Sequence, residues 1–288
     1  MLRRWSSPRL AGPRQARINP LCLDVSGLPC DGRLRLLSFN IQVGISTERY
    51  HHYVTRSWQH LLPHAGRAGN LQRIGDLLAG YDLVALQEAD GGSLRSGYVN
   101  QVEQLAQLGA FPYWYQQLNR NLGRFAQHSN GVLSRLEPQG LEDHPLPGPS
   151  GRGAILLRFG EGADALVVVV MHLALGGRVR TRQLAYIREL IGGYRHQVLM
   201  GDMNTQASDL LENSPLRDLG LQAPQIQATF PSWRPQRCLD HILLSPSLTL
   251  ERVDVLAQAS SDHLPVAVEI RLPDALRTEA LPVPTDRT

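Results

Sequence analysis

Apolar runs of strand length alternate along this chain with segments whose apolar residues recur every three or four positions. From Arg33 onward, glycine, proline or asparagine closes these segments, as expected at the ends of strands and helices. The pattern predicts nine strands, at residues 34–43, 82–88, 113–118, 131–134, 154–159, 165–173, 197–201, 240–244 and 265–271. An α/β domain with this many strands is too large for a small doubly wound sheet.

Three segments have the period of an amphipathic helix, at residues 70–78, 99–108 and 181–191. In the last of these, Thr181 is the predicted N-cap and Gly192 and Gly193 form the stop signal. Its predicted buried stripe consists of Leu184, Ile187, Leu190 and Ile191.

Residues 33–272 are expected to form one domain, because no repeat and no Pro- or Ser-rich linker divides them. Residues 1–32 are predicted to be a flexible basic arm with no acid before Asp24 and no apolar segment of the secretory kind. This arm is either simply solvated or binds an anionic membrane surface or nucleic acid through Arg3, Arg4, Arg9, Arg14 and Arg17. Residues 273–288 are expected to be a flexible tail.

Composition narrows the classes of function further. The longest apolar run, residues 165–171, is far too short to span a bilayer. The sequence has no lysine, which excludes Schiff-base and P-loop lysine chemistry. Its three cysteines are odd in number and not closely paired, so we expect a reducing, cytoplasmic location, peripheral to a membrane if the arm binds lipid. The net charge of +3 is too small to indicate a polyanionic partner.

Polar side chains stand at the ends of several strongly apolar strands, where packing alone would not place them. They are Asn40, Glu88, His172, Asp202, Asn204, Asp240, Asp262 and His263. Each of these has an ordinary structural interpretation when taken alone. Together, however, several acids that meet at one place need a cation, because burial of one unpaired carboxylate costs on the order of several kcal/mol. Carboxylates and amides without thiolates favour Mg²⁺ or Mn²⁺ over structural zinc.

The same segments carry a family resemblance. The motifs SFN, LQE, SNGVLSR, MHL, GDMN, LDHILLS and SDHLP occur in this order between Ser38 and Pro265. This series resembles the endonuclease/exonuclease/phosphatase superfamily, and its loops are most similar to the sphingomyelinase branch. The resemblance implies a four-layer α/β/β/α sandwich of two mixed sheets flanked by helices, with the site at one mouth between the sheets.

The resemblance also implies roles in metal-dependent attack of water on a phosphoester. Glu88 would ligate the divalent ion, and Asn40 would hold it directly or through water. Asp262 would lie near the metal or brace the loop. Asp202 would deprotonate the attacking water, and either Asp202 or His263 is the general base. The remaining implied contacts to the water or the phosphate come from Asn204, from His263 braced by Asp240, from the second imidazole His172, and from Asn130.

The substrate stays open at this stage. Arg152, Arg178, Arg180 and Arg182 would surround the phosphate or bind a second anionic group, unless they are ordinary surface arginines. The leading hypothesis is a phosphodiesterase acting on a phospholipid head group or another small phosphoester. The alternatives are a DNA or RNA nuclease and a catalytically silent binding module. A nuclease would use Tyr113, Trp114, Tyr115, Phe230 or Trp233 for base stacking, although a half-buried strand explains the first three equally well.

Overall fold

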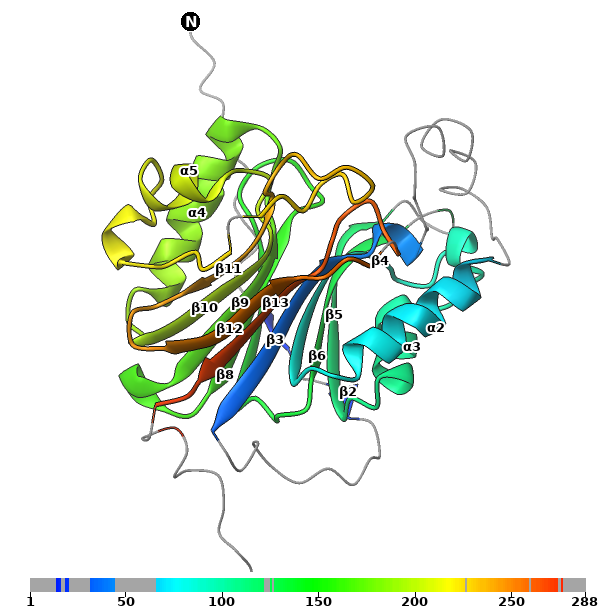
Figure 1. Ribbon diagram of the computed structural model, residues 1–288, viewed down its shortest axis with the longest axis horizontal. Helices are drawn as coiled ribbons and strands as arrows, with labels where there is room; N and C mark the ends of the chain where they lie inside the picture. The colour runs from blue at the N-terminus through cyan, green and yellow to red at the C-terminus, as the bar shows by residue number, and fades with distance from the viewer. Residues whose placement is uncertain are drawn as a thin grey trace, which may run out of the picture.

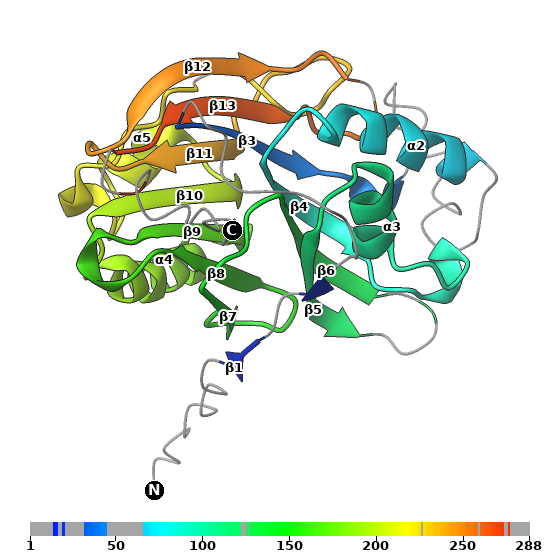
Figure 2. The same ribbon diagram turned by 90° about the horizontal axis from the view of Figure 1, so that it is seen from below.

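Two β-sheets pack face to face in the computed structural model, with helices on the outer face of each sheet (Figure 1). The structure describes residues 14–16, 19–20, 32–44, 66–121, 125, 127–225, 227–258, 260–273 and 276. The predicted four-layer α/β/β/α sandwich is confirmed. Figure 2 shows α2 and α3 on one outer side and α4 on the other.

The first sheet has the order β1 (Arg14–Gln15), β7 (Gly140–Pro145), β8 (Gly153–Phe159), β9 (Leu166–His172), β10 (His196–Asp202) and β11 (Asp240–Leu244). The second has the order β12 (Thr249–Val255), β13 (Val266–Arg271), β3 (Arg33–Asn40), β4 (Leu83–Asp90), β6 (Gln127–Ser134), β5 (Tyr113–Asn121) and β2 (Asn19–Pro20). Both sheets are mixed, because β9 and β10 are parallel, as are β3 and β4, among antiparallel neighbours.

The helices are α2 (Gly66–Leu78), α3 (Gln101–Leu108), α4 (Gly177–Ile191) and α5 (Ala207–Leu211). Short 3-10 turns lie at Gln42–Gly44, Leu94–Ser96, Gly162–Asp164 and Arg217–Leu219. Apolar side chains of α2 and α3 pack on the outer face of the second sheet, and those of α4 and α5 pack on the first. None of the described helices is long and apolar enough to cross a membrane.

All nine predicted strands are present, with their ends shifted by a few residues. The sequence pattern missed β7 and β12, because their polar residues hide the apolar alternation: GLEDHP and TLERVDV. All three predicted helices are present as well, and the stripe on α4 packs inward as expected. The predicted N-cap is wrong, because α4 begins at Gly177 and Thr181 lies in its second turn, donating from Oγ1 to the Gly177 carbonyl.

Two short pieces of the predicted N-terminal arm are edge strands. β1 pairs with β7 in the first sheet and β2 pairs with β5 in the second. The predicted domain start coincides with the first residue of β3, Arg33. Most of the arm and most of residues 274–288 lie outside the described residues, so their flexibility stays a prediction.

Candidate active site

The predicted site residues meet where the core between the two sheets reaches one mouth of the sandwich. Alternate residues of each strand face this core, for example Leu34 and Leu36 on β3, and Val168 and Val170 on β9. The same alternation continues toward the mouth, where the residues on the core-facing side of the strands are polar. They are Asn40 on β3, Asn130 on β6, His172 on β9, Asp202 on β10 and Asp240 on β11. All five are buried. The same periodicity that builds the core therefore also positions the site.

Asp202 lies at the centre of this group. Its Oδ2 accepts a hydrogen bond from Asn40 Nδ2 at 3.1 Å, and its Oδ1 accepts one from the backbone N–H of Asn204 at 3.0 Å. Burial raises the pKa of Asp202 to about 7, although the nearby His263 opposes this rise. A carboxylate whose pKa lies near neutrality is well suited to take a proton from water.

The glycine before Asp202 is required by the close approach of β10 to β9. Gly201 has φ +147°, and a Cβ there would lie 1.9 Å from the carbonyl oxygen of Met171. Just beyond the strand, Asn204 has φ +53° and donates from Nδ2 to the carbonyl of Leu173 at 2.9 Å. These contacts fix the GDMN segment against the end of β9.

His263 forms a dyad with Asp240. The two side chains are joined between Nδ1 and Oδ2 at 2.8 Å, and Thr229 Oγ1 donates to the same carboxylate oxygen at 2.5 Å. Burial alone would lower the pKa of His263, but the carboxylates of Asp240, Asp202 and Asp262 together outweigh it and raise this pKa to about 10. The ring therefore carries a proton on each nitrogen, and its Nε2 lies 3.9 Å from Asp202 Oδ2.

His172, in contrast to the doubly protonated His263, is neutral. Arg152 Nη1 lies 3.2 Å from His172 Nδ1, and a guanidinium only donates, so Nδ1 must accept and the proton must be on Nε2. Burial lowers the pKa of His172 well below its ordinary value, and the charge of Arg152 lowers it further. Nε2 lies 3.4 Å from Asp202 Oδ2. His172 is thus a neutral hydrogen-bond donor rather than a source of positive charge.

Glu88 reaches the mouth through a break in the register of β4. The pairing of β4 with β6 shifts between Leu86 and Ala89, and Glu88 has φ +57°, in the left-handed region. No described residue makes a hydrogen bond or ion pair with its carboxylate. Burial raises the pKa of the neighbouring Asp262 to about 6, opposed by His263 and reinforced by the charge of Glu88.

Two groups of side chains at the mouth offer oxygen or nitrogen donors to a divalent cation. Glu88 and Asp262 supply carboxylate oxygens and Asn40 supplies an amide oxygen, as a hard ion requires. A second group, formed by Asp202, Asp240 and His263, offers atoms that lie within 4.8 Å of one another. Among the described residues, this second group is the one in which three ligand atoms of Asp and His come this close together.

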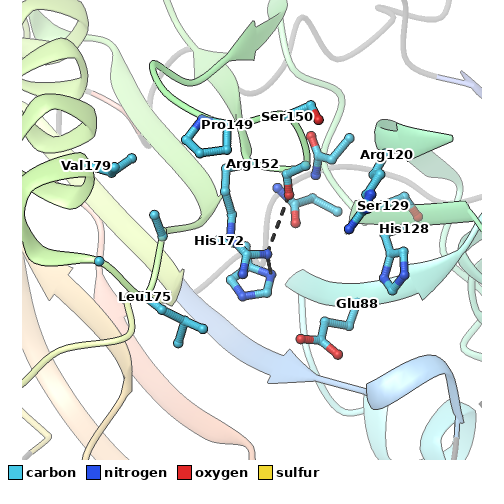
Figure 3. A pocket seen from close by; sticks show the side chains of 15 residues that line it. Glu88, Arg120, His128, Ser129, Pro149, Ser150, Arg152, His172, Leu175 and Val179 are labelled. Carbon is cyan, nitrogen blue, oxygen red and sulfur yellow. Dashed lines mark hydrogen bonds between the residues drawn. The ribbon is translucent and has the colours of Figure 1, made fainter. Parts of the chain in front are cut away.

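A cavity of about 530 Å³ opens beside His172 (Figure 3). Of the four predicted basic residues, only Arg152 lines it. Arg178 and Arg182 are exposed at the start of α4, and Arg180 donates to the carbonyls of Ala174 and Leu175. Asn130 lines the cavity and donates from Nδ2 to Gln117 Oε1 and to the Gly153 carbonyl.

Arg120 and His128 also line this cavity and were not predicted from the sequence. They lie on β5 and β6, on either side of the connection between the two strands. The only signal in the sequence is that His128 stands two residues before Asn130. Of the predicted aromatic residues, Tyr115 packs into the core between the sheets and Trp114 packs toward α2 and α3.

Comparison with known proteins agrees with this geometry. The family model described as "Endonuclease/Exonuclease/phosphatase family" matches residues 37–263. No curated protein matches the chain. Among solved structures, an endonuclease/exonuclease/phosphatase from Beutenbergia cavernae is 20% identical, with a TM-score of 0.64 over 83% of this chain and 72% of that one.

Two further neighbours show the same fold. A mannosyl-6-phosphatase of Bacteroides thetaiotaomicron is 16% identical, with a TM-score of 0.57 over 82% of this chain and 99% of that one. D. rerio TDP2, complexed with a single-strand DNA product, is 15% identical with a TM-score of 0.57, over 83% and 99% of the two chains. The family match spans the whole site, from β3 to His263. This chain therefore belongs to the endonuclease/exonuclease/phosphatase family, whose members hydrolyse phosphoesters.

Proposed function

We propose that this chain is a Mg²⁺- or Mn²⁺-dependent phosphodiesterase that acts on a phospholipid head group or another small phosphoester. The observation that carries this proposal is the environment of Asp202. Its carboxylate, with a pKa of about 7, is held by Asn40 and the Asn204 backbone and faces the imidazolium of His263. Hydrolysis of a phosphoester requires a base for the attacking water and a cationic hydrogen-bond donor for the phosphate, close to one another.

Each side chain then has a defined part. Asp202 accepts the proton of the attacking water, and His263 donates from Nε2 to a phosphate oxygen while Asp240 holds the ring. His172 donates from Nε2 without adding charge, and Arg152 supplies the positive charge on that side. Glu88, Asn40 and Asp262 would hold the metal ion, which stabilises the negative charge on the phosphate.

A small substrate is favoured over nucleic acid by the lining of the cavity beside His172. Among the described lining residues, none is Phe, Tyr or Trp, so this cavity offers no stacking surface for a base. The cavity itself accommodates an alcohol attached to the phosphate. A catalytically silent binding module would not require the His263–Asp240 dyad beside the buried carboxylate of Asp202.

An activity panel on the purified protein tests this proposal. We expect chelator-sensitive hydrolysis of bis(p-nitrophenyl) phosphate that Mg²⁺ or Mn²⁺ restores, and then a preference for phospholipid vesicles over supercoiled DNA and RNA. Asp202→Asn should abolish the activity, whereas the matched control Asp218→Asn, on the exposed surface, should not. Nicking of DNA would overturn the substrate preference. Turnover by Asp202→Asn equal to that of the wild type would overturn the enzymatic function.

A further inference from the structure

The cavity beside His172 has two chemically different walls (Figure 3). On one side lie the apolar side chains of Pro149, Leu175 and Val179. Across from them lie Arg120 and Glu88. The cavity is therefore shaped for a compact group that has an apolar or ring face and at least one polar end.

The two arginines of the cavity have different surroundings. Arg152 contacts His172, and the charges of Glu88 and Asp202 act on its guanidinium. Among the described residues, none accepts a hydrogen bond from the Arg120 guanidinium or forms an ion pair with it. Arg120 is thus an exposed cation at the cavity that forms no ion pair with a described residue, although the Glu88 carboxylate lines the same cavity.

Arg120 lies against the loop that precedes β8. Gly151 in this loop has φ +105°, and a Cβ there would lie 3.6 Å from Arg120 Cβ and 3.7 Å from its Cδ. The aliphatic part of Arg120 therefore lies over the Gly151 backbone, and its guanidinium points into the cavity (Figure 3). The neighbouring Asn119 lines the same cavity and adds an amide.

We infer that this cavity is a subsite for a second anionic group of the substrate, and that Arg120 binds this group. The inference rests on the proposed phosphoesterase function and narrows its substrate class. The scissile phosphate lies by Asp202 and His263, while a second phosphate or carboxylate on the attached alcohol pairs with Arg120. A planar guanidinium binds such a group through two parallel hydrogen bonds.

Two pairs of substrates that differ only in a second phosphate test this inference. One pair is the p-nitrophenyl ester of thymidine 5′-phosphate with and without a 3′-phosphate. The other is glycerophosphoinositol with and without a phosphate on the inositol ring. We expect kcat/KM to be about ten-fold or more higher for the doubly charged member of at least one pair, as for a charge-assisted contact. The pair with the larger ratio distinguishes a nucleotide from a polyol head group.

Arg120→Gln should bring this ratio close to one, and Arg120→Lys should retain part of it. Arg188→Gln, which removes an exposed arginine from the opposite end of α4, should leave the ratio unchanged. A wild-type ratio near one, with both members hydrolysed, would overturn this inference alone, as would a ratio that persists in Arg120→Gln. If neither member of any pair is hydrolysed, the proposed function fails and the inference fails with it.

Discussion

Replacing Asp240 with asparagine should discharge His263 at neutral pH. The pKa of His263 is raised from its ordinary 6.5 to about 10, against the effect of burial, and Asp240 contributes most to this rise. A difference of about 3.5 corresponds to roughly 5 kcal/mol in favour of the imidazolium. Without the Asp240 carboxylate, burial, which lowers the pKa, is opposed only by the charges of Asp202 and Asp262, so the pKa should fall well below 10.

The direction of the pH dependence follows from this fall. In the wild type His263 stays protonated up to about pH 9, whereas in Asp240→Asn most of it should be neutral at pH 8. The rate at pH 8 should therefore drop by about ten-fold or more. Lowering the pH should restore little of it, because Asp202, with a pKa of about 7, then becomes protonated and no longer serves as the base. NMR titration of labelled histidine and the pH profile of kcat/KM measure both effects. A variant whose His263 is still protonated at pH 8 would refute the reasoning.

Three further predictions concern other parts of the site. Glu88→Ala should lower turnover by about 10² or more in a steady-state assay, while circular dichroism shows an intact fold; normal turnover would exclude Glu88 as a metal ligand. Gly201→Ala should lower the free energy of unfolding by about 3 kcal/mol or more in denaturant titrations, because its Cβ would overlap the Met171 carbonyl. The control Gly193→Ala, with no atom within 4 Å of the new Cβ, should change stability little, and equal effects would contradict the argument. Arg152→Met should remove the hydrogen bond to Nδ1 of His172, and ¹⁵N NMR should then show a mixture of the two imidazole tautomers. A single, unchanged tautomer would show that Arg152 does not determine which nitrogen of His172 carries the proton.

The alternation of apolar residues predicted most of the fold, because the core between the sheets requires it. A residue such as Val168 or Val170 is apolar because it faces the opposite sheet. The resulting alternation can be recognised within a single strand, without knowledge of the strands beside it. Prediction from apolar alternation fails for β12, because most of its side chains are exposed or half-buried and charged residues are tolerated there. It also fails for β1 and β2, since two residues give no measurable period.

The cavity was less predictable than the residues around Asp202, for a physical reason. Residues at the ends of core strands continue a visible pattern, but Arg120 and His128 enter the site through the pairing of β5 with β6. The arginines of α4 were, by contrast, predicted to line the site although two of them do not. Arg178 and Arg182 follow the MHL motif closely, yet the helix begins earlier than expected and leaves both exposed. Nearness in sequence to a motif does not fix the direction of a side chain on a helix.

The two imidazoles of the site illustrate how partners, rather than residue type, determine chemical roles. The family resemblance implies that His172 is a second imidazole in contact with the water or the phosphate, which leaves open whether it carries a charge or acts as an acid. In this chain Arg152 donates to His172, which excludes a proton on Nδ1, while Asp240 accepts from His263 and retains one there. A histidine that must stay neutral cannot act as an acid at neutral pH. In the proposed mechanism the positive charge on that side of the phosphate therefore comes from Arg152, and the available acid is His263, across Asp202.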